Sequence, residues 1–381
     1  MVDAADFDPF AGGGDAAWPL LRRLRDAGPV ATVAGGMSYV TRWAECRAVM
    51  RDTTSFSNAS GMKAPGVEIP FEDRILGELD PPAHSTVRRV MVTALTPSAV
   101  HEAEAYMRAT ADALLDDIGG ADRADLVAAF TVPLPNRVTV HLLGFPSEDA
   151  DYLARLAKEL MESEFPLRNR TDRGVGFVNA FPEFAGYIDA QIDERERRIA
   201  EGQGGTDVVS RLVGAEIEGT RLSRTQVRAM TRNLITGGLT TTSQLLGNLL
   251  HQLLTDPEVE GALRAGDDAL DRAIEESLRV NPPILFVARG CVADTSVSGV
   301  PLAAGTRVVV GIGCANRDAV RWDDAERFRI DRDHSDQHLS FGYGPHVCPG
   351  ATLARAVARI GIRAVLDRYP GGALALAPGF R

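Results

Sequence analysis

Apolar residues recur every three or four positions along most of the chain, which predicts a mainly α-helical fold with small β-sheets. Near the N-terminus the pattern differs: strands at 30–33 and 37–41 meet at Gly35-Gly36, as in a β-hairpin. Residues 55–69 are rich in Ser, Gly and Pro and indicate an irregular loop. The β-rich portion of the chain, which includes the hairpin and ends with this loop, spans about 28–70. Helices are predicted at 17–27, 43–50, 80–95, 99–118, 149–163, 268–280 and 351–368, with one of about 25 residues ending in the charged run 193–198.

The longest predicted helix begins at a capping box formed by Ser223 and Gln226 and ends before Asp256-Pro257. A helix of roughly 30 residues is about 45 Å long, enough to cross a whole domain. Its centre, residues 236–242, contains two glycines and four threonines, and each glycine costs roughly 1 kcal/mol relative to alanine. Close packing against another helix would explain the glycines, but we favour a local distortion kept for function.

Composition restricts the class of protein. The formal net charge is −11 and the sequence pI is about 5.2, which disfavours nucleic acid as a partner. No apolar run approaches the roughly 20 residues of a membrane-spanning helix, and the acidic N-terminus does not resemble a signal peptide. The cysteines are scattered and form no CxxC pair, which opposes a zinc site or a disulfide scaffold and suits a reducing cytosol. We expect a cytoplasmic protein with no membrane partner.

A short segment before the last predicted helix carries the strongest candidate chemistry. Residues 338–350 contain three glycines and two prolines, so they form neither a helix nor a regular strand. Cys348 therefore lies at the N-terminus of the helix at 351–368, where free N–H groups and the helix dipole favour an anion. A thiolate is expected to be stabilised there. The simpler alternative is a buried cysteine in an ordinary turn.

The pattern Phe341-Gly342-x-Gly344-x-His346-x-Cys348-x-Gly350 resembles the heme-binding loop of the cytochromes P450, and Leu353-Ala354-Arg355 extends the match. The resemblance implies that Cys348 is the metal ligand of heme b, with Phe341, Gly342 and Gly350 close to the porphyrin. A thiolate ligand donates electron density to iron and favours O–O cleavage. It also implies one cytochrome P450 domain over residues 1–381, with heme between the long central I helix and the proximal L helix at 351–368.

Two further motifs resemble parts of the same family. Asp80-Pro81-Pro82-x-His84-x-x-x-Arg88 is similar to the start of the family's C helix, whose His and Arg bind heme propionates. His84 and Arg88 are four residues apart and so share a helix face, which could otherwise be an ordinary solvated basic face. Arg289 and His346 match the other propionate-binding positions, although His346 could instead be a turn histidine bonded to backbone.

Glu276-x-x-Arg279 resembles the ion-pair signature of the family's K helix, which implies a structural role. The segment after it would run along the heme edge and contact substrate. The loop at 61–76 and residues 161–165 are further expected parts of the pocket. The substrate-binding residues that the resemblance implies are Leu234, Gly237, Gly238, Ile284, Leu285, Phe286, Val287 and Phe165.

The centre of the long helix resembles the family's oxygen-binding segment, with Thr241 at the position of the usual alcohol. Thr240 occupies the position of the usual acid, so the expected catalytic pair is Thr241 and Thr240. Protons could come through water held by these threonines, from another carboxylate such as Glu162 or Glu164, or from the substrate. A fourth possibility is unusual chemistry, such as oxidative coupling or peroxide-driven oxidation.

The resemblance implies a heme-thiolate monooxygenase that uses O2 to oxidise a hydrophobic small molecule, such as a secondary metabolite. Because no Gly-rich flavin or nicotinamide fingerprint follows a predicted strand, electrons are expected from a ferredoxin and an NAD(P)H-dependent ferredoxin reductase. A monomer is expected. The alternatives are a non-catalytic heme-thiolate sensor, a peroxide-driven heme enzyme, and a protein without heme in which Cys348 is a nucleophile. Only 11 residues follow Tyr369-Pro370, so the family's C-terminal hairpin is expected to be missing or truncated.

Overall fold

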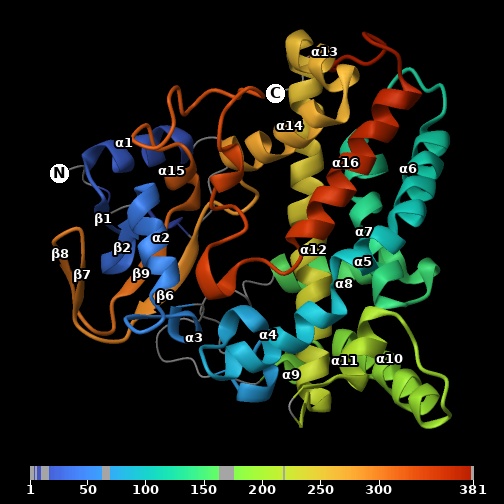
Figure 1. The fold of residues 1–381 in the computed structure, drawn as a ribbon, viewed down its shortest axis with the longest axis horizontal. Coiled ribbons are helices and arrows are strands. Elements are labelled where there is room, and N and C mark those ends of the chain that lie inside the picture. Colours follow the sequence, from blue (N-terminus) through green and yellow to red (C-terminus); the bar gives the residue numbers. More distant parts are fainter. Residues whose placement is uncertain are drawn as a thin grey trace.

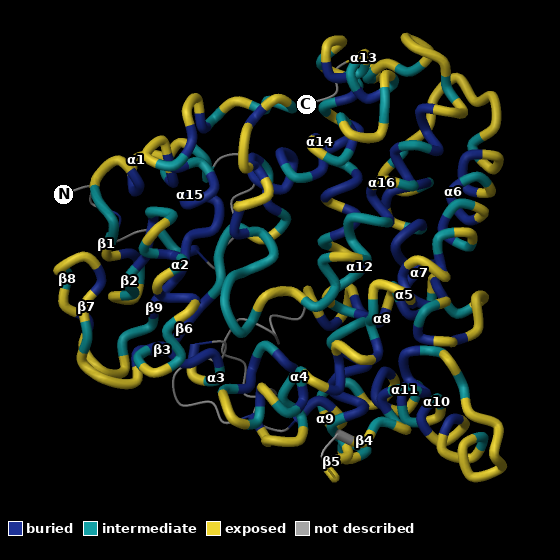
Figure 2. Tube along the Cα trace, in the orientation of Figure 1, coloured by how far each residue is buried: buried dark blue, intermediate teal, exposed yellow. Residues whose placement is uncertain are grey.

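A computed structural model describes residues 4, 7–9, 17–61, 69–162, 176–217 and 219–378. Most of the strands gather at one end of the molecule, and long helices make up the other (Figure 1). Figure 2 shows that the helices turn buried faces toward one another while the loops at their outer ends are exposed. Every helix within the described ranges is too short or too polar to span a bilayer.

The main sheet joins strands from both ends of the sequence. Its order is β1-β2-β9-β6-β3, with β2 and β9 parallel and the other neighbouring pairs antiparallel. Two separate hairpins are formed by β4 with β5 and by β7 with β8. The strands are β1 (Val30–Val33), β2 (Met37–Val40), β3 (Phe56–Ser57), β4 (Glu216–Ile217), β5 (Thr220–Arg221), β6 (Val287–Cys291), β7 (Thr295–Val297), β8 (Val300–Leu302) and β9 (Arg307–Val310).

The N-terminal predictions are confirmed except in the stretch expected to be irregular. The hairpin of β1 and β2 turns at Gly35 and Gly36, both with left-handed φ values near 70°. Residues 56–61 contain β3 and a short helix, α3 (Asn58–Gly61), rather than a loop. The cause is a distant carboxylate: Asp80 accepts hydrogen bonds from the backbone N–H groups of Asn58 and Ala59 at 2.8 and 3.4 Å.

The helical predictions are confirmed with two changes and several additions. Pro182 starts a new helix, so the predicted helix of about 25 residues is 19 residues long and is preceded by a separate turn. Residues 97–118 form two helices that meet at Ala103. Helices not predicted from the sequence cover Pro133–Leu143, Val208–Gly214, Pro257–Ala265 and Ile312–Asn316. The helices are α1 (Trp18–Ala27), α2 (Trp43–Arg51), α4 (Ala83–Ala94), α5 (Pro97–Glu102), α6 (Glu104–Ile118), α7 (Pro133–Leu143), α8 (Ala150–Glu162), α9 (Phe177–Ala180), α10 (Pro182–Ala200), α11 (Val208–Gly214), α12 (Arg224–Thr255), α13 (Pro257–Ala265), α14 (Asp267–Val280), α15 (Ile312–Asn316) and α16 (Ala351–Arg368).

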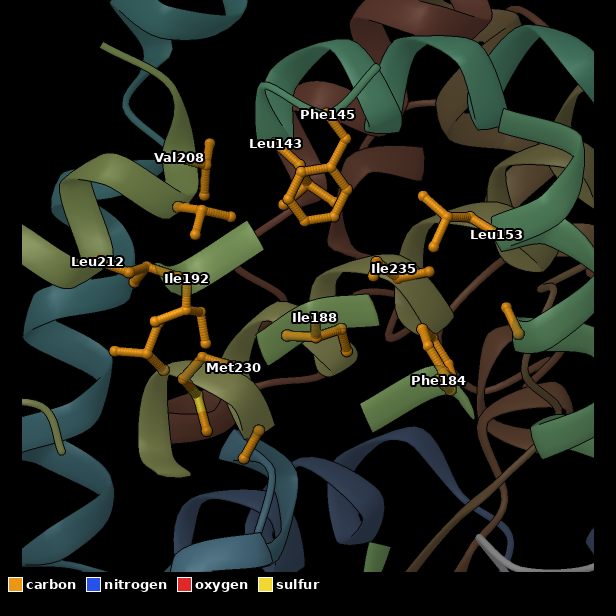
Figure 3. Close-up of a cluster of buried hydrophobic side chains, with 14 of the residues drawn as sticks. Leu143, Phe145, Leu153, Phe184, Ile188, Ile192, Val208, Leu212, Met230 and Ile235 are labelled. Atoms are coloured by element: carbon orange, nitrogen blue, oxygen red, sulfur yellow. The ribbon is translucent and has the colours of Figure 1, made fainter. Parts of the chain in front are cut away.

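The central helix α12 organises the helical part of the molecule. Its capping box is formed as predicted: the Gln226 N–H donates to Ser223 Oγ at 3.2 Å, and the Ser223 N–H donates to Gln226 Oε1 at 2.9 Å. The predicted distortion does not interrupt the helix, which continues through Gly237 and Gly238. One apolar core joins α12 to α7, α8, α10 and α11, as the side chains in Figure 3 show. A second core joins α12 to α6, α14 and α16.

Candidate functional site

The loop before α16 is shaped by two left-handed glycines. Gly342 and Gly344 both have φ of 74°, a conformation that few L residues adopt. The Cys348 N–H donates to the Phe341 carbonyl oxygen at 2.7 Å and closes the loop. Cys348 thus lies two residues before Gly350, the N-cap of α16, and it is the only exposed cysteine of the four.

The protonation of Cys348 differs from the sequence prediction. Although Cys348 is exposed by surface area, the protein atoms packed around its sulfur desolvate the thiol and raise its pKa, while the Gly350 N–H and the charges of Arg88 and Arg355 act to lower the pKa. The N-terminus of α16 therefore does not by itself stabilise a thiolate, because desolvation outweighs these favourable contacts. A metal ion bound at sulfur would supply the missing stabilisation of the anion.

A large cavity separates α12 from the Cys348 loop and the first turns of α16. About 1760 Å³ of space is free of protein atoms here, including the part open to solvent. Most of the residues that the sequence assigned to the site meet at this cavity. They are Arg88, Leu234, Gly237, Gly238, Thr241, Ile284, Val287, Arg289, Phe341, Gly342, His346, Cys348 and Gly350.

Two histidines stack at one end of the site without hydrogen-bond partners. The rings of His84 and His346 are 3.8 Å apart, and three of their nitrogens (both of His84 and Nε2 of His346) are buried and unpaired. Burial lowers the pKa of His84 to about 4, aided by the charge of Arg88. Burial also lowers the pKa of His346 to about 3, with contributions from His84 and the two nearby arginines.

The two arginines near these histidines are Arg88 and Arg289. Neither guanidinium forms an ion pair with a carboxylate in the described part of the chain, and Arg289 is only 5% exposed. Its one hydrogen bond within the described residues runs to the Ala288 carbonyl oxygen at 2.9 Å. Burial lowers the pKa of Arg289 to about 10, against the opposing effect of Asp80. Buried unpaired cations are costly, so this cluster is built to receive an anion.

These residues fit the heme expected from the sequence. Heme offers an iron centre for a cysteine ligand and two propionates for a cationic, donor-rich pocket. The cavity presents one accessible cysteine sulfur, at Cys348, and the side chains of Arg88, Arg289 and His346, with His84 behind His346. The guanidinium groups and the unpaired histidine nitrogens match those carboxylates. The chemistry of these residues therefore fits heme, with a sulfur for the iron and unpaired polar atoms for the propionates.

A buried ion-pair network supports the loop from behind. Glu276 and Arg279, both 0% exposed, pair with a distance of 2.7 Å between Glu276 Oε2 and Arg279 Nε. Arg332 donates to the same carboxylate at 2.9 Å. Beside it, Arg355 binds Glu275 through two hydrogen bonds and lies over the Phe341 ring, 4.6 Å from its centre. These contacts join α14 and α16 to the cysteine loop.

Several predicted residues lie elsewhere. Thr240 is exposed and lies outside the cavity lining, whereas Thr241 lines it and donates to the Gly237 carbonyl oxygen at 2.8 Å. Leu285 and Phe286 pack toward α1 and β2 rather than into the cavity. Phe165 and Glu164 lie outside the described residues, as do residues 62–68 of the 61–76 loop. Glu162 is exposed at the end of α8, with its carboxylate 3.7 Å from Lys158 Nζ.

Sequence reasoning missed the contribution of α7. Pro135, Val138, Thr139 and Leu142 line the cavity opposite α16. Residues 138–143 are largely apolar, but the two prolines before them do not suggest a helix. Asn233, one turn before Gly237 on α12, was also missed, although a polar residue inside an otherwise apolar helix face was a usable signal.

Comparisons with known proteins show the family to which the chain belongs. The family model described as Cytochrome P450 matches residues 25–370. The chain is 33% identical to the cytochrome P450 monooxygenase PikC of Streptomyces venezuelae, over 95% of this chain and 86% of that protein. It is 30% identical to the erythromycin C-12 hydroxylase of Saccharopolyspora erythraea, over 92% and 86% of the two chains.

Among solved structures, CYP109E1 from Bacillus megaterium in complex with testosterone superimposes with a TM-score of 0.81. That match has 27% identity and covers 98% of this chain and 94% of the other. The described fold, the cysteine loop with its cation cluster, and these similarities lead to one assignment: the chain is a member of the cytochrome P450 monooxygenase family.

Proposed function

We propose that this protein is a heme b monooxygenase that uses O2 to oxidise a hydrophobic secondary metabolite, with electrons from a ferredoxin and an NAD(P)H-dependent ferredoxin reductase. The observation that carries the proposal is the meeting of Cys348, Arg88, Arg289 and His346 at one cavity, with the His84 ring against that of His346. We treat the chain as one functional domain, since the family match spans residues 25–370.

In this proposal Cys348 binds the iron, and His84, Arg88, Arg289 and His346 hold the propionates. Phe341 packs under the Arg355 guanidinium and keeps the loop in place, while Gly342 and Gly350 leave room for the porphyrin. Bound heme supplies the activation of O2. The cation cluster is already assembled, so binding does not require it to be gathered from distant parts of the chain.

Thr241 is the hydroxyl that we assign to proton handling at the distal side. It lines the cavity, and its bond to the Gly237 carbonyl oxygen fixes its position. Thr240 faces away and is exposed, so we assign it no direct contact with the reacting atoms. Glu162 is exposed at the end of α8 and outside the cavity lining, which favours solvent water over this carboxylate as the proton source.

The substrate proposal rests on the wall of the cavity and on the relatives. Leu76, Met91, Leu95, Leu142 and Leu234 make the wall largely apolar. PikC and the erythromycin C-12 hydroxylase are relatives over most of the chain, and the latter's name states a hydroxylation of a natural product. A molecule of that class would bury its apolar surface against these residues.

The decisive test is the absorbance spectrum of the reduced protein with carbon monoxide. We expect a strongly red-shifted Soret band in the wild-type protein, lost in Cys348→Ser and retained in Cys291→Ser, which alters a buried cysteine away from the cavity. Protein that cannot be loaded with heme would contradict the proposal.

Electron delivery is tested separately by following NADH consumption and product formation with a surrogate ferredoxin and reductase. Heme binding without turnover would favour a sensor, and turnover with hydrogen peroxide alone would favour the peroxide-driven alternative.

A further inference from the structure

Three polar side chains in the cavity wall, those of Asn233, Thr139 and Thr242, have no hydrogen-bond partner among the described residues. Asn233 lies on α12 and Thr139 on α7, two helices that pack against each other, and both line the cavity. Within the described residues, neither side chain makes a hydrogen bond. Polar groups in an apolar wall are costly unless something pairs with them.

The other polar residues of the cavity are accounted for. Thr241 donates to the Gly237 carbonyl oxygen, Asn58 Nδ2 donates to the Gly77 carbonyl oxygen at 3.2 Å, and Ser340 Oγ donates to the Leu278 carbonyl oxygen at 2.6 Å. The arginines and His346 belong to the cation cluster. Asn233, Thr139 and Thr242 remain, and the first two lie next to the same pair of glycines.

Gly237 and Gly238 have no side chains, which leaves space on α12 beside Asn233 and beside Thr139. A Cβ atom on Gly237 would lie 3.8 Å from Asn233 Nδ2, and one on Gly238 would lie 3.4 Å from Thr139 Oγ1. We call this space the glycine notch. A ligand group that entered the notch could approach the helix backbone and reach the amide and the hydroxyl.

We propose that Asn233, assisted by Thr139, binds an oxygen-containing group of the substrate at the glycine notch, either a hydroxyl or a carbonyl. The proposal rests on the proposed function and specifies its substrate class. Asn233 precedes Thr241 by eight residues, so the two positions are about 12 Å apart along the helix. The substrate is then a hydrophobic molecule with an oxygen function roughly that far from the carbon that is oxidised.

Asn233 is thus a positioning and specificity residue. A small number of polar groups in an apolar pocket commonly fixes the orientation of a ligand, because the wrong orientation leaves them unpaired. An analogue without the oxygen would bind more weakly and in several orientations.

The test uses the heme-loaded protein and three probes: testosterone and its two analogues that each lack one of its oxygens. Binding is followed by the substrate-induced shift of the Soret band and independently by calorimetry. In the wild-type protein we expect one analogue to bind about tenfold more weakly than testosterone. Asn233→Leu should abolish this difference in affinity between testosterone and the analogue, and Thr139→Val should reduce the difference. The matched control Gln244→Leu changes an exposed amide on the same helix, outside the cavity, and should preserve it.

The proposal is overturned if Asn233→Leu keeps the wild-type difference between the probes, or if the wild-type protein binds all three equally or none of them. Failure of the proposed function would be visible before any probe is added: the protein would lack heme or would not show the red-shifted carbon monoxide band.

Discussion

Removal of the Glu276 carboxylate should destabilise the protein more than the loss of an ordinary ion pair. Glu276 accepts hydrogen bonds from Arg279 at 2.7 and 2.8 Å, from Arg332 Nε at 2.9 Å and from the Arg329 backbone N–H at 2.9 Å. Glu276→Ala leaves two guanidinium groups, each at most 7% exposed, without their anion. Breaking a buried pair in this way costs about 3–5 kcal/mol.

The magnitude can be measured as a shift in Tm. Unfolding entropy near 2.1 cal/mol/K per residue gives roughly 0.8 kcal/mol/K for this chain, so a loss of about 4 kcal/mol lowers Tm by about 5 °C. The assay is thermal and urea denaturation of the heme-free protein, followed by circular dichroism. Glu276→Gln keeps one acceptor oxygen but loses the charge and should fall between the wild type and Glu276→Ala.

The matched control is Glu159→Ala, which breaks a surface pair with 2.7 Å between Glu159 Oε1 and Arg155 Nη1. Exposed pairs contribute about 0–1 kcal/mol, so this variant should shift Tm by no more than about 1 °C. If Glu276→Ala lost no more stability than Glu159→Ala, the network would not have the structural role assigned to it.

Three further predictions concern the cavity and its surroundings. Because the folded, heme-free protein holds the pKa of His84 near 4, below the ordinary 6.5, the unfolded chain takes up a proton that the folded chain does not as pH falls through this window. The free energy of unfolding of the heme-free wild-type protein should therefore fall more steeply between about pH 6.5 and 4 than that of the heme-free His84→Phe variant. Equal slopes of this free energy against pH, measured by urea titration, would refute the prediction. Gly237→Ala should stabilise α12 by up to about 1 kcal/mol in urea unfolding, because the added methyl meets only Asn233 Nδ2 at 3.8 Å; a loss of stability would contradict it. Gly61→Ala should lower heme retention on gel filtration, because the new Cβ overlaps the backbone of Arg289, and retention equal to wild type would count against that close packing.

Local signals in the sequence predicted most of the fold. The capping box at Ser223 and the Gly35-Gly36 turn act over a few residues, so they are readable without tertiary information. The helix α7 was not predicted because Pro133 and Pro135 usually interrupt helices, yet both fall in its first turn, where a missing N–H costs little. The turn at α3 depends on Asp80, a partner more than 20 residues away.

The site was predicted from the cysteine loop, and the remaining errors concern the direction of side chains. Successive residues of a helix point about 100° apart. Thr241 and Thr242 both line the cavity, whereas Thr240, on the other side of Thr241, lies outside it. The segment before β6 divides in the same way: Ile284 and Val287 line the cavity, while Leu285 and Phe286 face the N-terminal layer. A motif gives the position of a residue along the chain, but burial and packing decide which neighbour points inward.

The mixed sheet has a consequence for synthesis of the chain. Tyr39 pairs with Val309, and Phe56 pairs with Cys291, so strands made early wait for partners made some 230 to 270 residues later. Contacts of such long sequence separation form slowly because a large loop must close first. On the ribosome, β1 and β2 would emerge as an isolated hairpin, which is at best marginally stable in water. Strand β6, which carries Arg289, therefore gains its neighbouring strands only when nearly the whole chain has been made. The cation cluster is completed at the same late stage.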